Sequence, residues 1–274
     1  MPRALAESAA PPGESADAPG PGPQSSLERL LQVIDLFTPD KPEWTADQIG
    51  GVMAVSRATQ YRYIKALTNA GLLASAGDGR HRLGPRFVVL DRQIRLSDPL
   101  LRHGPPVMAR ASRELGNAQL LCTYFGDEVL CIHQELVDPS IHSSMERGRP
   151  FPLFRGSPSR AILAWLPESH LRNLMLSHSH EIRETGLGSN WTEFRQRIKD
   201  IRAQGHYIGR GEIDRDLMGV GVPILRAGGE LVGSLTTIMP LQDHAPQALA
   251  RHIRVTKEAA AEIAASLSSA SPET

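Results

Sequence analysis

The sequence has few cysteines, no net charge and no long apolar run. Its two cysteines, Cys122 and Cys131, are weak evidence for a disulfide because nothing else suggests export, so we expect reduced, buried thiols, with redox sensing as the alternative. Lys plus Arg and Asp plus Glu number 30 each, so any charge signal for nucleic acid must be local. No stretch is long and apolar enough to span a bilayer, and we expect no membrane partner.

The length and composition indicate a globular protein of about two domains. The chain has 274 residues, of which 41% are hydrophobic and 22% charged, as is usual for such proteins. Residues 1–24 are rich in Ala, Pro and Gly without apolar periodicity, which predicts a disordered tail. They lack the apolar core of a secretory signal and the Arg and Ser content of a transit peptide. We therefore expect a cytoplasmic protein.

Residues 25–86 have the pattern of a winged helix-turn-helix domain. Ser25 or Ser26 can cap a first helix, Thr45 a second, and Ser56 a third that runs over residues 57–69. The segment Gly77-Asp78-Gly79 lies between two short extended runs and is a strong signal for a hairpin. Three helices followed by a hairpin make a winged helix-turn-helix.

The third helix is the candidate DNA-reading element. Residues 56–65 contain three cations and no carboxylate, and recognition helices contact base edges from their N-terminal end. If Ala58, Tyr61 and Ile64 face the core, Arg57 and Gln60 face outward, where Arg can pair with guanine and Gln with adenine. The candidate DNA contacts are Thr45, Ser56, Arg57, Thr59, Gln60, Arg62 and Lys65, with Arg80 and His81 in the wing. The alternative is a solvated basic helix, but three helices and a wing favour DNA binding.

The rest of the chain predicts a linker helix and a second domain. Residues 87–98 mix apolar and charged residues as a linker helix does, and residues 99–270 alternate helices with strands. A hairpin is expected around Gly126-Asp127, helices begin near Ser157 and Asn190, and strands cover 207–213, 218–225 and 231–238. A last helix covers 247–267. The fold class is therefore α+β, with a mainly antiparallel sheet in the second domain.

Several segments together resemble the isocitrate-lyase-regulator (IclR) family of transcriptional regulators. In the first domain they are Ser26-Leu27-Glu28-Arg29, Ser56-Arg57-Ala58-Thr59-Gln60-Tyr61-Arg62, Ala70-Gly71-Leu72-Leu73 and Arg80-His81-Arg82-Leu83-Gly84-Pro85-Arg86. In the second they are Pro152-Leu153, Arg160-Ala161-Ile162-Leu163-Ala164, Gly205-His206-Tyr207, Glu212 and Val220-Gly221-Val222-Pro223-Ile224. The resemblance implies a GAF-like effector-binding domain after the winged helix, and homodimers or dimers of dimers on DNA.

The resemblance also implies a place for the effector, expected to be an organic acid. The candidate effector-binding residues are Gly156, Ser157, Gly209, Gly219, Val220, Thr236 and Ile238. The family usually has polar or small hydroxyl residues at several of these positions, so the glycines here predict a larger or more apolar pocket. Ser157 precedes a helix whose free N–H groups would favour an anion. In the alternative interpretation, Ser157 only caps its helix and Thr236 only satisfies a strand.

No motif for catalysis, metal binding or a cofactor stands out. We expect His178-Ser179-His180 to be an exposed loop, because no Cys or carboxylate stands at ligand spacing beside it. Cys131 and His133 lack a third catalytic group. The sequence therefore predicts no enzyme but a DNA-binding transcriptional regulator that binds a double-stranded operator and a small-molecule effector. The alternatives are an enzyme with an accessory winged helix and a protein-interaction module that keeps the winged helix as scaffold.

Overall fold

The computed structural model describes residues 25–137, 143–242 and 245–269. The chain forms two compact units that divide between Arg92 and Gln93, within helix α4 (Arg86–Ser97), so we treat each unit separately. The predicted tail, residues 1–24, lies outside the described residues. The domain limits 25–86, 87–98 and 99–270 remain predictions.

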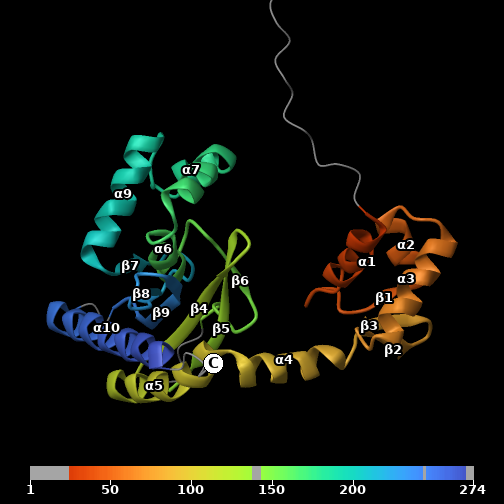
Figure 1. The fold of residues 1–274 in the computed structure, drawn as a ribbon, viewed down its shortest axis with the longest axis horizontal. Coiled ribbons are helices and arrows are strands. Elements are labelled where there is room, and N and C mark those ends of the chain that lie inside the picture. The colour runs from red at the N-terminus through yellow and green to blue at the C-terminus, as the bar shows by residue number, and fades with distance from the viewer. Residues whose placement is uncertain (1–24, 138–142, 243–244, 270–274) are drawn as a thin grey trace, which may run out of the picture. The chain divides into compact units, whose positions relative to one another are not determined.

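The N-terminal unit is a winged helix-turn-helix, as predicted (Figure 1). Its elements are α1 (Ser26–Asp35), β1 (Trp44–Thr45), α2 (Ala46–Met53), α3 (Arg57–Asn69), β2 (Leu73–Gly77) and β3 (Arg80–Leu83). Ser25 caps α1 in a reciprocal box with Glu28, and Thr45 caps α2 in the same way with Gln48. The antiparallel wing has the strand order β1-β3-β2; the two-residue β1 was too short to be predicted.

The predicted orientation of α3 is right for Ile64, which is buried, and for Arg57, which is exposed, but it is wrong for Gln60 and Tyr61. Gln60, Tyr63, Ile64 and Leu67 are its buried residues, whereas the side chain of Tyr61 is 66% exposed. The prediction followed a spacing of three through residues 58, 61 and 64, but the buried stripe of an α-helix alternates spacings of three and four. Gln60, expected to face DNA, is 7% exposed and is therefore a residue of the core between α2 and α3.

A glycine in α2 makes room for Gln60. A Cβ atom at Gly50 would lie 2.0 Å from Oε1 and 2.7 Å from Cδ of Gln60, while a Cβ atom at neighbouring Gly51 would meet nothing within 4 Å. Helix α2 therefore tolerates the low helix propensity of Gly50 because the buried glutamine needs the space.

This contact gives the first testable prediction. Gly50→Ala should lower the free energy of unfolding of the N-terminal unit by roughly 1–3 kcal/mol through overpacking. Gly51→Ala is the matched control and should raise it by up to about 1 kcal/mol through helix propensity. Combining Gln60→Ala with Gly50→Ala should remove the clash. Denaturant unfolding would measure the free energy of unfolding of all these variants. Equal stabilisation by Gly50→Ala and Gly51→Ala would contradict this packing.

The C-terminal unit contains a six-stranded sheet in the order β6-β5-β4-β9-β8-β7. The strands are β4 (Ala118–Phe125), β5 (Glu128–Glu135), β6 (Pro150–Pro152), β7 (Tyr207–Arg210), β8 (Leu217–Leu225) and β9 (Leu231–Pro240). Every neighbouring pair is antiparallel, which confirms the predicted α+β class. The hairpins β4–β5 and β8–β9 supply the centre of the sheet.

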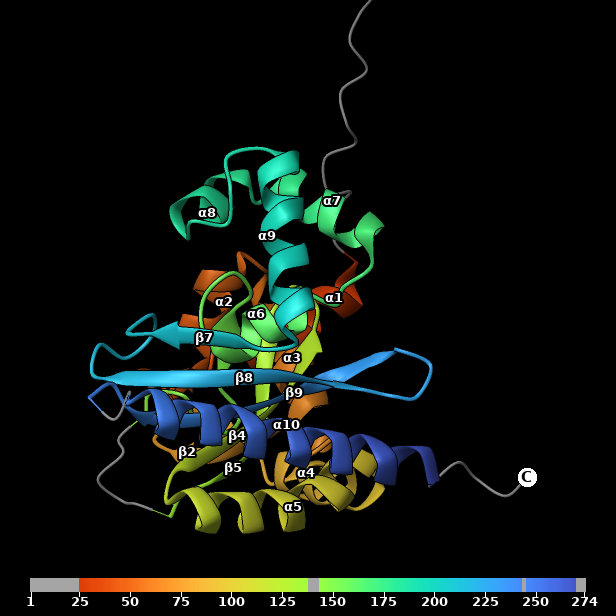
Figure 2. The ribbon, with the colours of Figure 1, turned by 90° about the vertical axis from the view of Figure 1, so that its left-hand side faces the viewer.

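Helices cover both faces of this sheet, and each face has its own apolar core (Figure 2). Helices α5 (Pro99–Leu115) and α10 (Pro246–Ser269) cover one face. The other face carries α6 (Ser157–Leu163), α7 (Glu168–Ser177), α8 (Ser179–Glu184) and α9 (Trp191–Gln204). Successive strand residues point to opposite faces, so Leu120 enters the α6 core and Leu121 the α5–α10 core.

The segment His178-Ser179-His180 is not the expected loop. Helix α8 begins at Ser179, directly after His178 has ended α7. Each histidine lies near a carboxylate one turn on: His178 Nδ1 is 3.8 Å from Glu181, and His180 Nδ1 is 3.5 Å from Glu184. The premise that no carboxylate stands at a suitable spacing is therefore also wrong. The loop prediction failed because these spacings of three and four residues are those of a helix face.

Candidate DNA interface and ligand pocket

The exposed face of α3 is cationic and carries one aromatic ring. Arg57, Arg62 and Lys65 are exposed, and Lys65 Nζ lies 5.9 Å from the centroid of the Tyr61 ring. The helix contains no acidic residue. Tyr61 is thus a surface residue that the sequence-based orientation had placed in the core. Tyr63, two residues later, is buried, and residues two apart in a helix do not share a face. Choosing Tyr63 as the core residue would therefore have predicted an exposed Tyr61.

Two of the three hydroxyl residues predicted to contact DNA, Thr45 and Ser56, cap helices. The Ser56 hydroxyl accepts a hydrogen bond from the Thr59 N–H at 3.3 Å and donates one to the Thr59 hydroxyl at 3.1 Å. The Thr45 hydroxyl accepts one from the Gln48 N–H at 3.3 Å. Ser56 and Thr45 therefore hold the first turns of α3 and α2 in place, and Thr59 also accepts a bond from the Arg62 guanidinium at 3.4 Å.

The two predicted wing residues differ in exposure. Arg80 begins β3 next to the turn, is exposed, and lies 3.6 Å from the carboxylate of Glu43. His81 follows inside the strand opposite Trp44 and Ser75, and its buried Nδ1 atom has no hydrogen-bond partner within the described chain. The side chain of Arg80 is therefore more exposed to solvent than that of His81.

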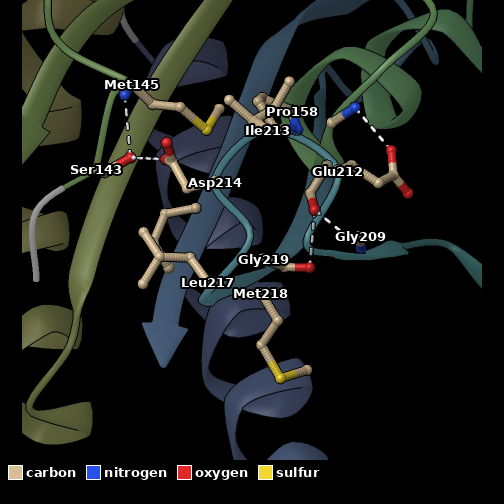
Figure 3. Close-up of a pocket in the computed structure, with 13 residues that line it drawn as sticks. Ser143, Met145, Pro158, Gly209, Glu212, Ile213, Asp214, Leu217, Met218 and Gly219 are labelled. Atoms are coloured by element: carbon tan, nitrogen blue, oxygen red, sulfur yellow. Dashed lines mark hydrogen bonds between the residues drawn. The ribbon is translucent and has the colours of Figure 1, made fainter. Parts of the chain in front are cut away.

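A small cavity lies between the first turn of α6, strands β7 to β9 and two loops (Figure 3). Its volume is about 20 Å³, which is room for about one water molecule. The lining residues are Ser143, Met145, Gly156, Ser157, Pro158, Gly209, Glu212, Ile213, Asp214, Leu217, Met218, Gly219 and Ile238. Five predicted effector-binding residues are among them: Gly156, Ser157, Gly209, Gly219 and Ile238.

The other two predicted pocket residues do not line this cavity. Val220 belongs to the core under α5 and α10; because it directly follows Gly219 in β8, its side chain must point to the opposite face. Thr236 lies on the α6 side in register with Leu120 and Gly221, but it is completely buried. Its Oγ1 atom has no hydrogen-bond partner in the described part of the structure.

Ser157 occupies the space that the glycines leave. Its hydroxyl donates to the carbonyl oxygen of Gly219 at 2.8 Å and accepts from the N–H of Gly209 at 3.0 Å. A Cβ atom at either glycine would lie 2.7 Å from Ser157 Oγ, and one at Gly221 would lie 2.2 Å from the Ser157 carbonyl oxygen. The glycines thus permit close docking of α6 on the sheet, so the prediction of a larger pocket is wrong for this conformation.

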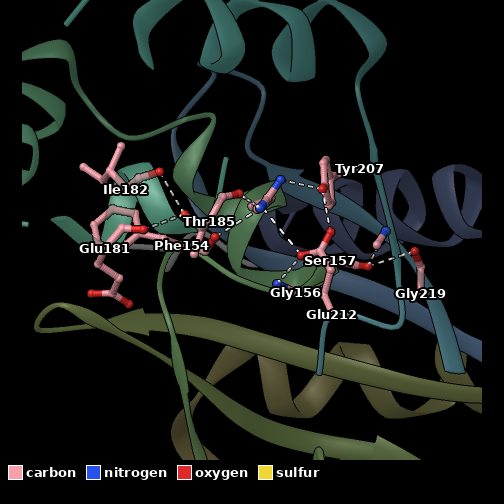
Figure 4. Close-up of polar contacts among 11 residues, drawn as sticks. Phe154, Gly156, Ser157, Glu181, Ile182, Thr185, Tyr207, Glu212 and Gly219 are labelled. Atoms are coloured by element: carbon pink, nitrogen blue, oxygen red, sulfur yellow. Dashed lines mark hydrogen bonds and ion pairs between the residues drawn. The ribbon is translucent and has the colours of Figure 1, made fainter. Parts of the chain in front are cut away.

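The Glu212 carboxylate closes the cavity beside Ser157 (Figure 4). It accepts hydrogen bonds from the Gly156 N–H at 2.9 Å and the Tyr207 hydroxyl at 2.6 Å, and Arg160 Nε lies 3.6 Å away. Burial raises the pKa of Tyr207, and the bond to Glu212 raises it further although Arg160 opposes this, so Tyr207 stays a neutral donor. The free N–H groups of helix α6 were predicted to favour an anion, and directly before the helix the Gly156 N–H is bound by the protein's own carboxylate.

Arg160 connects Tyr207 and Glu212 to Phe154 and to the end of α8. Its guanidinium donates to the Tyr207 hydroxyl at 2.5 Å and to the carbonyl oxygens of Thr185 and Phe154 at 2.6 and 3.2 Å. The charged residues that line the described cavity are both acids, Glu212 and Asp214. Asp214 accepts hydrogen bonds from the Ser143 hydroxyl at 3.2 Å and the Ser144 N–H at 3.0 Å. Sequence reasoning missed the roles of Asp214 and Arg160, which have no local signal.

Two further findings concern membranes and metals. Among the residues that the structure describes, no helix is long and apolar enough to cross a membrane. Within the same residues, no cluster of three or more His, Cys, Asp or Glu side chains could hold a metal ion.

Known proteins resemble both units of the chain. The model of the IclR helix-turn-helix domain matches residues 26–77, and that of the bacterial transcriptional regulator IclR C-terminal domain matches residues 97–265. The Pca regulon regulatory protein of Pseudomonas putida is 28% identical over 213 residues, which cover 77% of this chain and 72% of that protein.

Solved structures share the fold. An IclR homologue from Microbacterium hydrocarbonoxydans, complexed with 4-hydroxybenzoate, matches with a TM-score of 0.72 and 23% identity over 90% of this chain and 100% of that one. An IclR transcriptional regulator from Alicyclobacillus acidocaldarius matches with a TM-score of 0.72 and 19% identity, covering 88% and 98%. The relatives are named as regulators, so the alternative of an enzyme with an accessory winged helix is not favoured. The chain belongs to the IclR family: it is a transcriptional regulator with an N-terminal helix-turn-helix domain and the C-terminal domain of IclR regulators.

Proposed function

We propose that the chain binds a double-stranded operator through the exposed face of α3 and that a small molecule bound beneath α6 changes this binding. The observation that carries the DNA part is the acid-free face formed by Arg57, Tyr61, Arg62 and Lys65. The Arg57 and Arg62 side chains can pair with guanine, and the Tyr61 ring can contact a thymine methyl group. Lys65 is proposed to bind a phosphate, because its ammonium group is a point charge that lacks the paired donors with which arginine reads a base.

Most of the remaining candidate residues are proposed to contact the DNA backbone on either side of α3. Ser56, Thr59 and Thr45 lie at the starts of α3 and α2, where backbone N–H groups favour a phosphate. Arg80 supplies a wing contact to the DNA backbone, and His81 adds a contact only through the part of its ring that is exposed. Gln60 has no direct role in this proposal because it is buried.

The proposed regulator is a homodimer or a dimer of dimers that acts in the cytoplasm, where an operator is accessible. Helix α1 supports self-association because Leu27 and Leu31, one turn apart, are 75% and 57% exposed. A second copy that covers this face would remove apolar surface from water. Two-fold symmetry then predicts an operator with two inverted half-sites.

The proposed ligand is an organic acid, and the 4-hydroxybenzoate of the Microbacterium hydrocarbonoxydans structure makes it the first probe. A cavity of about 20 Å³ is far smaller than a typical ligand site, so binding must move α6 away from the sheet. A ligand carboxylate would replace Glu212 at the Gly156 N–H, and the apolar Met145, Ile213 and Ile238 would contact its body. A ligand that favours this open state shifts the population towards it.

Variants of α3 test the DNA part. Duplexes selected from a random pool by the wild-type protein provide the sites. Arg57→Ala and Tyr61→Ala should change the preferred sequence and lose roughly 1–3 kcal/mol of discrimination. Lys65→Ala should weaken binding to all sites about equally. It should also reduce the slope of log affinity against log salt concentration by about 1, the value for one phosphate contact. Lys199→Ala, which makes the same charge change at an exposed position of α9, is the control. Unchanged site selection by both Arg57→Ala and Tyr61→Ala would refute the proposed interface.

A charge change at the cavity tests the ligand part. Glu212→Gln removes the competing carboxylate and leaves Arg160 uncompensated, so it should bind 4-hydroxybenzoate about tenfold more tightly, or by about 1.4 kcal/mol. Glu230→Gln, on the exposed turn before β9, is the matched control and should bind as the wild type does. Calorimetry measures the affinities, and thermal unfolding checks that both variants are folded. An equal or lower affinity of a folded Glu212→Gln variant would place the carboxylate elsewhere.

A further inference from the structure

The only two cysteines of the sequence lie directly opposite each other in the sheet. Cys122 of β4 is the register partner of Cys131 of β5, and both are free thiols with no exposed surface. Their side chains enter the same core, on the α6 side of the sheet. Neither thiol takes part in the proposed DNA interface or ligand pocket.

The backbone geometry of the pair suits a cross-strand disulfide. The β4–β5 hairpin closes with the pair Phe125 and Glu128, and the register from there to Cys122 and Cys131 is regular. Alternation from the turn makes the cysteines a non-hydrogen-bonded pair, whose Cα atoms are typically about 4.5 Å apart. In agreement, the backbone N–H and C=O groups of Cys131 bond to Arg149 and Gly148 instead. Disulfides span Cα separations from about 4.4 to 6.8 Å.

The two thiols differ in acidity. Burial raises the pKa of Cys122, and the neighbouring Cys131 raises it further. The interaction with Cys122 lowers the pKa of Cys131 although burial opposes this, and the charge of Arg147 adds to the lowering. The thiolate is the nucleophile. We therefore assign the attack on an oxidant to Cys131, because the Arg147 side chain binds the carbonyl oxygen of the adjacent Ile132 at 2.9 Å; Cys122, the register partner of Cys131, attacks Cys131 in turn.

We propose that Cys122 and Cys131 form an oxidation site at which a peroxide converts the dithiol into a reversible cross-strand disulfide. The Cys131 thiolate attacks one peroxide oxygen, an S–O bond forms, the O–O bond breaks and hydroxide leaves. The Cys122 sulfur then attacks the Cys131 sulfenic acid, loses its proton and displaces a second hydroxide. With the two thiol protons, hydrogen peroxide yields two molecules of water while two thiols are oxidised to one disulfide.

A short strand forms the sheet edge next to the site. Strand β5 is covered at the sheet edge by β6, whose three residues include Pro150 and Pro152. Prolines donate no backbone hydrogen bond, so β6 is weakly held and can open locally more easily than the central strands. Hydrogen peroxide is only slightly larger than water and needs only such a small opening.

The disulfide should be easy to reduce. Non-hydrogen-bonded pairs typically have Cα separations near the lower limit for disulfides, and strained disulfides have more oxidising potentials than relaxed structural ones. A dithiol reductant should therefore restore both thiols, which distinguishes this site from oxidative damage.

Thiol mapping on the folded full-length protein tests the proposal. Hydrogen peroxide treatment, followed by denaturing alkylation and mass spectrometry, should show both cysteines protected, a mass lower by two hydrogens and a crosslinked Cys122–Cys131 peptide. Dithiothreitol should reverse all three changes. Sulfinic acid without a crosslink, or reaction only after denaturation, would overturn the proposal.

Single variants test the order of attack. In Cys122→Ala, the remaining Cys131 should form a sulfenic acid that a dione probe traps; in Cys131→Ala, the remaining Cys122 should react at least tenfold more slowly. Equal trapping at either cysteine would overturn the assignment of Cys131 as nucleophile. Thermal unfolding shows whether each variant is folded. The crosslink in the wild-type protein tests whether the disulfide forms, and that test needs no variant.

Discussion

The close docking of α6 on β7 and β8 is the contact on which the proposed effector site of the C-terminal unit depends. Three glycines permit it, because a side chain at Gly209, Gly219 or Gly221 would collide with Ser157. In return, Ser157 satisfies a backbone donor on one strand and a backbone acceptor on the other. Buried polar groups need such partners, so the serine and the glycines form one unit. This docking sets the cavity volume at about 20 Å³.

Two charged residues extend this docking to the surrounding elements. Glu212 joins the loop after β7 to the Gly156 N–H, and Arg160 joins α6 to Thr185 at the end of α8. Any movement of α6 that admits a ligand must therefore exchange these bonds as well. A ligand with different affinities for the docked and undocked states would bias the equilibrium between them, which is what an effector-controlled regulator requires.

Elements with local signals could be predicted from the sequence, whereas contacts between distant segments could not. The Asp-Gly turn of the wing and the Asn190 cap of α9 act within a few residues, and both occur in the structure. The orientation of α3 was misjudged because Tyr61 and Tyr63 are alike in polarity and only packing against α2 distinguishes them. The prediction was wrong for Val220 because neighbouring residues of a strand point to opposite faces, so Val220 and Gly219 cannot both face the cavity. Glu212 bonds to a backbone group 56 residues away, and no local pattern reveals that.

Hydrogen exchange of the Gly156 and Gly209 amides tests the account most directly. In the free protein both amides donate hydrogen bonds, to Glu212 and to Ser157, and should be protected. If a ligand opens the cavity by lifting α6, saturating 4-hydroxybenzoate should increase exchange at Gly209, which loses Ser157. Exchange at Leu235, in the centre of β9, should stay unchanged. Bound ligand with unchanged protection at Gly209 would contradict the claim that α6 docking closes the effector site.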